Sequence, residues 1–132
     1  MGELLRELHA HHFDHRDLKA LNILVGPKSS TPADAANSSS GGTGCALYLL
    51  DLDALWPWRR LPESRRVQNL SRLHVSFRSD AVVSRTDKLR FLKSYLPAGR
   101  RGREHWKAVW RQIADRTEAK VQLNSERGRP LW

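Results

Sequence analysis

The chain has 132 residues, with 23 basic and 14 acidic side chains, a formal net charge of +9 and 39% hydrophobic residues. This length is typical of one domain, and the composition allows a modest core and disfavours full disorder. No apolar run approaches the roughly 20 residues that span a bilayer, and the first residues lack the layout of a signal peptide. Membrane-spanning and secreted proteins are therefore disfavoured. The single cysteine, Cys45, suits a reducing compartment, and we expect it to be inert.

The charge is unevenly distributed along the chain. Residues 1–58 hold 4 basic and 7 acidic side chains, a net charge of −3, whereas residues 59–132 hold 19 and 7, a net charge of +12. Basic runs of this kind form solvated helix faces or bind anions. We do not expect nucleic acid as the partner, because no nucleic-acid-binding motif accompanies the basic residues. The clustered arginines are Arg59, Arg60, Arg65, Arg66, Arg100, Arg101 and Arg103.

The first half predicts one helix and one hairpin. Leu4, Leu5 and Leu8 indicate a short amphipathic helix that ends near His11 or His12. Residues 22–25, apolar after Asn22, and the apolar residues 46–50 are runs of strand length, the first of which we expect Gly26-Pro27 to stop. Residues 26–44 between them are small, polar or turn-forming, and predict a flexible, low-complexity loop within the hairpin.

The second half predicts three helices with narrow apolar stripes. The first is expected to start at Pro62 and Glu63, the second at Thr86 and Asp87, and the third near residue 102. Pro97 and Gly99 are expected to end the second helix. The expected buried positions are Val67, Leu70, Leu73 and Phe77; Leu89, Leu92 and Leu96; and Trp106, Val109, Trp110, Ile113 and Val121. The expected fold is α+β and mainly α, with helices plus one β-hairpin over residues 1–122 and a basic tail at 123–132.

The segment H-R-D-L-K-A-L-N at residues 15–22 carries the chemistry. Asp17 precedes Asn22 by five residues on an irregular loop that leads into a strand, which can present a carboxylate and an amide oxygen to one cleft. Phosphoryl transfer needs one group to accept a hydroxyl proton and another to hold a metal ion. Asp51 ends the second strand and can share that metal. These three residues therefore form a candidate phosphotransfer site, the alternatives being a capped turn and a solvated strand end.

The segment matches the catalytic-loop pattern H-R-D-L-x-x-x-N of protein-kinase-like enzymes, and L-L-D-L-D at 49–53 resembles the strand that leads into their D-F-G motif. Within that superfamily, the chain most resembles the bacterial lipopolysaccharide-core kinases, which phosphorylate Kdo or heptose sugars. The shared features are D-L-D at 51–53, N-L-S-R-L at 69–73 and R-F-L-K-S-Y-L at 90–96. The resemblance covers residues 1–122 and implies the C-terminal lobe of a kinase fold.

The resemblance implies a role for each matching residue. Asp17 would be the catalytic base for the acceptor hydroxyl, and Lys19 would contact the transferring phosphate of ATP. Asn22 and Asp51 would bind Mg2+. These are the expected catalytic, nucleotide-binding and metal-binding residues.

Two further residues would support the site. By the same resemblance, His15 would brace the catalytic loop against the metal-binding turn, and Arg16 would orient the segment after Asp51. Leu52 and Asp53 stand where the kinase pattern has Phe and Gly. The glycine-rich loop, strand lysine and glutamate partner of the kinase N-terminal lobe have no counterpart here, so we expect a truncated or inactive chain, or a partner that covers the missing lobe.

The expected function is ATP-dependent transfer of a γ-phosphate to a sugar hydroxyl of an anionic glycolipid. We expect a cytoplasmic protein, peripheral at the inner membrane, where Trp56 and Trp58 beside Arg59 and Arg60 suit an interface. A protein Ser/Thr kinase or small-molecule kinase lobe is one alternative. A non-catalytic basic module that binds anionic membrane or nucleic acid is another.

Four histidines near the start invite a metal-site interpretation. They are His9, His11, His12 and His15. A structural zinc site is disfavoured, because the helix is expected to end before His11 and His15 can share one of its faces. Trp106 and Trp110 are expected to be core residues, since they stand at helical spacing.

Overall fold

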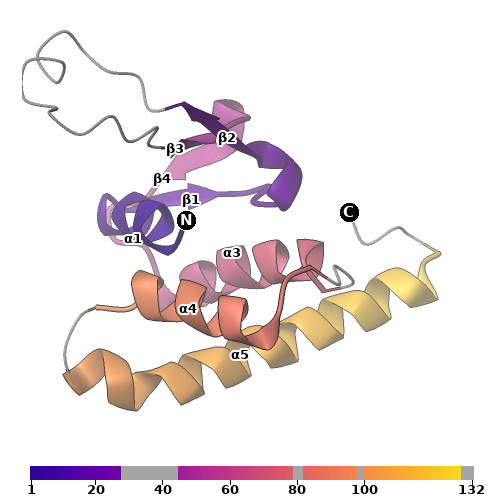
Figure 1. Cartoon of the computed structure of the whole chain (residues 1–132). Coiled ribbons are helices and arrows are strands. Elements are labelled where there is room, and N and C mark those ends of the chain that lie inside the picture. The colour runs from indigo at the N-terminus through magenta and orange to yellow at the C-terminus, as the bar shows by residue number, and fades with distance from the viewer. Residues whose placement is uncertain (28–44, 79–81, 98–99, 129–132) are drawn as a thin grey trace, which may run out of the picture.

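The computed structural model describes residues 1–27, 45–78, 82–97 and 100–128, the side chains of 100–104 excepted. The fold is α+β and mainly helical, and Figure 1 shows the strands, with α1 beside them, on one side of α3, α4 and α5, and α5 running along α3 and α4. The elements are α1 (Gly2–Ala10), β1 (Phe13–His15), the 3-10 turn η1 (Ala20–Asn22), β2 (Ile23–Pro27), β3 (Cys45–Leu49), the 3-10 turn η2 (Leu52–Ala54), β4 (Leu55–Pro57), α3 (Glu63–Ser76), α4 (Arg85–Tyr95) and α5 (Arg100–Glu126).

The predicted hairpin is confirmed. β2 and β3 pair antiparallel, with Ile23 opposite Leu49 and Pro27 opposite Cys45. The prediction that Gly26-Pro27 stops the first strand was wrong, since both residues belong to β2. Proline is tolerated at the end of an edge strand because it does not have to donate a hydrogen bond to a neighbouring strand there. From residue 28 onwards, the predicted flexible loop 26–44 lies outside the described residues.

A second small sheet was not predicted. β1 and β4 pair antiparallel, with Asp14 opposite Trp56, so the expectation of a single hairpin was incomplete. Each strand has three residues, which is too short for apolar and polar positions to alternate recognisably. This pairing holds the start of the predicted catalytic loop at residues 15–22, called the catalytic loop below, against the residues that follow Asp51.

The core lies between the helices, where α3 packs on α5 and α1 packs on α4. The predicted stripes are largely confirmed, because most of their members are buried: Val67, Leu70, Leu73, Leu92, Leu96, Val109 and Ile113. Phe77, Trp106 and Trp110 are partly buried against this cluster. Leu5 of α1 and Leu18 of the catalytic loop are fully buried in the same cluster, which ties the loop to the helical core.

His9 is a core residue, with 1% of its surface exposed. Its Nε2 lies 3.1 Å from Asn69 Nδ2, which donates to it, and its Nδ1 lies 2.8 Å from the Tyr95 hydroxyl. Burial lowers the pKa of His9 to about 4 and raises the pKa of Tyr95 to about 12. Both groups are therefore neutral near pH 7, and His9 links α1 to α3 and α4.

Two helix boundaries differ from the prediction. α4 begins after Ser84, which forms a capping box with Asp87: the Ser84 hydroxyl accepts from Asp87 N, and the Asp87 carboxylate accepts from Ser84 N, both at 3.2 Å. The predicted start at Thr86 and Asp87 was therefore late. α5 continues to Glu126, so the first residues of the predicted tail at 123–132 are helical.

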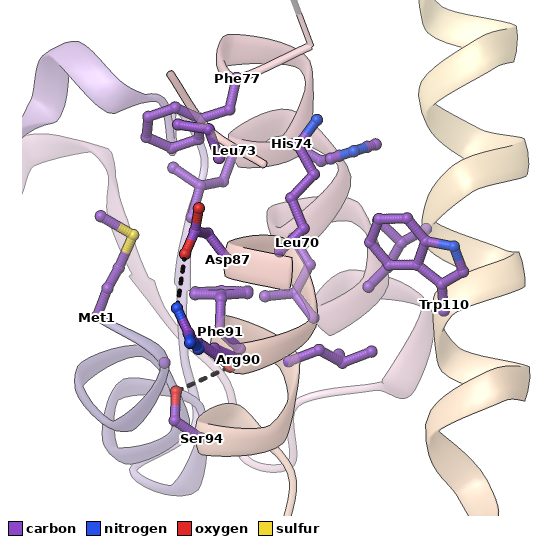
Figure 2. Close-up of a pocket in the computed structure, with 15 residues that line it drawn as sticks. Met1, Leu70, Leu73, His74, Phe77, Asp87, Arg90, Phe91, Ser94 and Trp110 are labelled. Carbon is purple, nitrogen blue, oxygen red and sulfur yellow. Dashed lines mark hydrogen bonds and ion pairs between the residues drawn. The ribbon is translucent and has the colours of Figure 1, made fainter. Parts of the chain in front are cut away.

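An apolar cavity of about 530 Å³ lies among α1, α3, α4 and α5. Figure 2 shows Leu70 and Leu73 of α3, Phe91 of α4 and Trp110 of α5 around it, with Met1 at the α1 side. No residue of the predicted catalytic site lines this cavity.

Candidate active site

His15 connects the two halves of the predicted site. Its side chain is fully buried, and its Nε2 lies 3.0 Å from the carbonyl oxygen of Leu50. Its Nδ1 accepts a hydrogen bond from the backbone N–H of Asp17, at 3.3 Å. Because Nδ1 accepts, Nε2 carries the proton and donates to Leu50. One imidazole ring therefore fixes both Asp17 and the residue that precedes Asp51.

Asp17 presents an ionised carboxylate at the surface. Its side chain is 51% exposed, and its Oδ2 lies 2.7 Å from Lys19 Nζ and 3.3 Å from Asn22 Nδ2. The hydrogen bond from Lys19 is the main cause that lowers the pKa of Asp17, with smaller contributions from the charge of Lys19 and from Asn22. The two predicted catalytic residues, Asp17 and Lys19, are thus in direct contact.

Asn22 is oriented by its amide nitrogen, which donates to the carbonyl oxygen of Asp17 at 2.8 Å. This orientation leaves the amide oxygen as the atom that a metal could use. The backbone N–H of Leu50 donates to the carbonyl oxygen of Asn22 at 2.8 Å, which places the end of β3 beside η1. Asn22 and the residue before Asp51 are therefore neighbours across the hairpin.

Asp51 is exposed and has a left-handed backbone, with φ 57° and ψ 59°. Non-glycine residues seldom adopt positive φ, although aspartate does so more readily than most. Within the described residues, no three His, Cys, Asp or Glu side chains gather into a metal cluster. Asp51 and the Asn22 amide oxygen nevertheless suit Mg2+, which takes few protein oxygen ligands and completes its shell with water and phosphate oxygens.

Arg16 contacts the segment that follows Asp51. Its backbone N–H donates to the carbonyl oxygen of Ala54 at 2.9 Å, and its guanidinium lies 4.0 Å from the centre of the Trp56 ring. The latter is a cation–π distance. Both contacts lie on the β1–β4 side of the site, and they tie η2 and β4 to the catalytic loop.

A small cavity beside Asp17 was missed by sequence reasoning. It has a volume of about 140 Å³, and its lining residues are Asp17, Leu18, Lys19, Arg72, Ser76, Lys120 and Asn124. The signal that could have revealed it is a pair of polar residues four apart on each of two helices, Arg72 and Ser76 on α3 and Lys120 and Asn124 on α5.

The basic residues singled out in the sequence lie elsewhere or are not described. Arg59 and Arg60 are exposed between β4 and α3. The side chains of Arg100, Arg101 and Arg103 lie outside the described residues. Cys45 is exposed and is not in a disulfide. In the part of the chain that the structure describes, no helix is both long and apolar enough to cross a bilayer.

Comparisons with known proteins identify the family of the chain. The model of the lipopolysaccharide kinase (Kdo/WaaP) family matches residues 1–95. A solved structure described as "WaaP in complex with acyl carrier protein" has a similar fold, with a TM-score of 0.66 and 21% identity over 89% of this chain and 45% of that one. The chain thus spans less than half the length of that relative. A search of the curated proteins found no match. The family match covers well over half of the sequence, and the chain therefore belongs to the lipopolysaccharide kinase (Kdo/WaaP) family.

Proposed function

We propose that the chain is the C-terminal lobe of an ATP-dependent phosphotransferase, which transfers the γ-phosphate to a sugar hydroxyl of an anionic glycolipid of the Kdo or heptose type. Family membership supports the reaction class. The observation that carries the proposal is the bridge through His15, which joins the backbone N–H of Asp17 to the carbonyl oxygen of Leu50, the residue before Asp51. In this proposal, Asp17 is the proton acceptor, and Asn22 and Asp51 are the metal ligands that follow from the same bridge and from the Leu50–Asn22 backbone hydrogen bond.

In the proposed mechanism, Asp17 orients the acceptor hydroxyl and accepts its proton. Its pKa is lowered by Lys19, so the carboxylate is ionised at neutral pH but is a weak base. Its main contribution is then positioning, which is the larger part of catalysis in phosphoryl transfer. Lys19, 2.7 Å from the same carboxylate, offsets negative charge where the phosphate approaches.

Asn22 and Asp51 would hold Mg2+ in this mechanism. The bound ion supplies neutralisation of the charge on the phosphate oxygens. Asn22 would contribute an amide oxygen whose direction is set by its hydrogen bond to Asp17, and Asp51, which has a left-handed backbone, would contribute a carboxylate. His15 and Arg16 act as positioning residues, since their contacts are with backbone and with Trp56.

A surface of exposed apolar side chains suits the docking of a second lobe. Leu24 of β2 and Tyr48 of β3 stand opposite one another, on one face of the hairpin, and each is at least 40% exposed. Exposed apolar side chains gathered on one element pair commonly mark an interaction surface. We assign this hairpin surface to the nucleotide-binding lobe of a complete kinase, supplied by a partner or by a longer chain. ATP would then lie between the two lobes, above Asn22 and Asp51.

The proposed location is the cytoplasmic face of the inner membrane, with peripheral contact. Trp56 is 49% exposed, and Arg59 and Arg60 follow it as exposed cations. Indole rings favour the membrane interface, and each nearby basic side chain adds about 1 kcal/mol of attraction to anionic lipid. Cosedimentation with vesicles that contain anionic lipid should show binding that weakens in Arg59→Gln and Arg60→Gln and in high salt.

Calorimetric titration with ATP and Mg2+ tests nucleotide binding. We expect binding that requires Mg2+ and weakens about tenfold or more in Asp51→Asn, because a charged ligand to the ion is lost. Asp53→Asn, two residues away and also exposed, is the matched control and should bind as the parent does. An equal loss of ATP affinity in both variants, or ATP binding that does not depend on Mg2+, would contradict the proposal.

The catalytic role requires a form of the enzyme that turns over. In that form, Asp17→Asn should lower turnover by about two orders of magnitude or more, since positioned proton acceptors contribute roughly that much. An unchanged rate would remove the assignment. Acceptors that carry Kdo or heptose should be phosphorylated in preference to protein acceptors. The reverse preference would favour a protein kinase lobe.

A second proposal concerns the apolar cavity of Figure 2, to which we assign the acyl chain of an acyl carrier protein. It rests on the apolar lining, on the volume of about 530 Å³ and on the solved relative, which is described in complex with acyl carrier protein. Acylated carrier protein should raise the melting temperature of the chain, and carrier protein without an acyl chain should not. Equal stabilisation by both forms would contradict this assignment.

A further inference from the structure

The small cavity beside Asp17 is assembled from three separate elements. The catalytic loop provides Asp17 and Lys19, while α3 provides Arg72 and α5 provides Lys120. Ser76, at the end of α3, accepts a hydrogen bond from the backbone N–H of Ala20 at 3.2 Å, so the loop and the helix are joined at this point. The volume of about 140 Å³ is well above the roughly 10–15 Å³ that one water needs. The cavity can therefore hold a compact polar group.

The charge around the cavity is strongly positive. Three cations and one carboxylate line it, and the carboxylate of Asp17 is already paired with Lys19 at 2.7 Å. Within the described residues, neither Arg72 nor Lys120 forms an ion pair. Burial lowers the pKa of each, and each is further lowered by neighbouring cations. The two cations therefore repel one another in a partly desolvated place, which an anion would relieve.

Arg72 carries a second and independent sign of a missing partner. Its Nη1 is buried and lacks a hydrogen-bond partner among the described residues. Buried polar atoms without a partner are rare in native proteins, and each calls for an explanation. Asp14, buried on β1, offsets part of the positive charge of Arg72, but no hydrogen bond joins the two. An anion in the adjoining cavity, which Arg72 lines, would offset the charge of the guanidinium.

We infer that this cavity is an oxyanion subsite, and that it binds a phosphate or carboxylate group of the acceptor beside the hydroxyl that receives the new phosphate. The inference rests on the proposed function, which places the acceptor hydroxyl at Asp17. Neither of the proposed metal ligands, Asn22 and Asp51, lines the cavity. The subsite therefore adjoins the place assigned to Mg2+ through Asp17, but it does not contain the proposed metal ligands. It limits acceptors to sugars with an acidic group near the reacting hydroxyl.

The test is an NMR titration of the full chain with inorganic phosphate at constant ionic strength. We expect saturable shifts at the amides of residues 17–20 and 120–124. Lys120→Met should weaken phosphate binding about tenfold, because a charged hydrogen bond is lost. Arg111→Met, an exposed residue on the same helix outside the cavity, should leave it unchanged. Absence of saturable shifts, or equal weakening in both variants, would overturn the subsite.

A second arm separates the acceptor from the nucleotide as the source of the anion. Binding of ATP with Mg2+ should be the same in the parent chain and in Lys120→Met. If that variant weakens nucleotide binding as much as it weakens phosphate binding, the cavity holds a nucleotide phosphate and the acceptor assignment is overturned. If phosphate binds but ATP with Mg2+ does not, the cavity is still an oxyanion site. The proposed function then fails, and the assignment of the anion to the acceptor fails with it.

Discussion

The catalytic loop and the helices below it are stabilised in different ways. In the loop, exposed Asp17 takes its position from hydrogen bonds to single atoms, above all through fully buried His15. In α3, α4 and α5, position comes from apolar area that is spread over many side chains of one core. Leu18 belongs to both regions, because it is a loop residue that is fully buried in the helical core. The loop is therefore fixed in position where Leu18 anchors it to the core, and it is exposed at Asp17, where it would meet substrates.

The largest expected effect separates two leucines of the loop. Leu18 is fully buried and Leu21 is 73% exposed. Leu18→Ala should lower the free energy of unfolding by about 2–5 kcal/mol, because it leaves a cavity in the core. Leu21→Ala should change it by less than about 0.5 kcal/mol. Urea unfolding of both variants measures the two changes in the free energy of unfolding. Similar changes would show that Leu18 does not anchor the loop more strongly than Leu21 does.

The next effect is a pH dependence that arises in the helical region. His9 has a folded pKa of about 4, below the unfolded value of 6.5, so the unfolded chain takes up its proton first as the pH falls. The contribution of His9 to the free energy of unfolding is therefore fully present above pH 6.5, and it is lost as the pH falls from 6.5 to 4. From pH 7 to pH 5 the loss should be about 2 kcal/mol. The pKa of His74 is also lowered, mainly by burial, so protonation of His74 in the unfolded chain adds to the loss of stability at low pH.

Replacement of His9 checks this assignment. His9→Gln should remove most of the loss of stability between pH 7 and pH 5, as measured by urea unfolding at the two pH values. His11→Gln, at an exposed position two residues away, should retain it. If both variants keep the full dependence, the buried histidine of α1 is not its source.

A smaller effect concerns the start of α4. Ser84→Ala should lower the free energy of unfolding by about 1 kcal/mol, because the side-chain cap of the helix is lost. Thr86→Ala, at the position where the sequence alone placed the start, should cost much less. Chemical denaturation of the two variants discriminates between the starts, and a larger cost for Thr86→Ala would contradict the capping box.

The smallest effect is local to the catalytic loop. Lys19→Met should raise the pKa of Asp17 towards its ordinary value, because the hydrogen bond from Lys19 is the main cause of the lowering. Titration of the Asp17 carboxyl carbon by NMR measures the shift. The unfolding free energy should hardly change, since the Asp17 side chain is 51% exposed and the Lys19 side chain 34% exposed, so water screens the pair. An unchanged pKa would show that another group holds the carboxylate ionised.

The sequence predicted those features that depend on a short fixed spacing. The hairpin and the buried stripes of α3, α4 and α5 follow from local apolar patterns, and the loop at 15–22 follows from residue types at set positions. The β1–β4 sheet could not be predicted, because each strand is three residues long and its partner lies about 40 residues away. Tertiary pairing alone reveals it.

The cations beside Asp17 were missed for a different reason. Arg72 and Lys120 stand on helices with many basic residues, and polar positions four apart on a helix normally face solvent. The two side chains approach the loop because of the way α3 and α5 pack together. This packing cannot be predicted from the local sequence around either residue. The four histidines show the same limit, since burial of His9 and His15 and exposure of His11 are set by tertiary contacts.

The most direct test of the account is paramagnetic NMR of the full chain with Mn2+ in place of Mg2+ and with ATP present. We predict that the amide signals of residues 17–22 and 50–53 broaden together at low Mn2+, and that Asp51→Asn abolishes this broadening. Joint broadening would show that the loop and the turn hold one metal. Broadening at exposed carboxylates elsewhere, such as Glu118 and Glu126, with the loop signals unaffected, would contradict it.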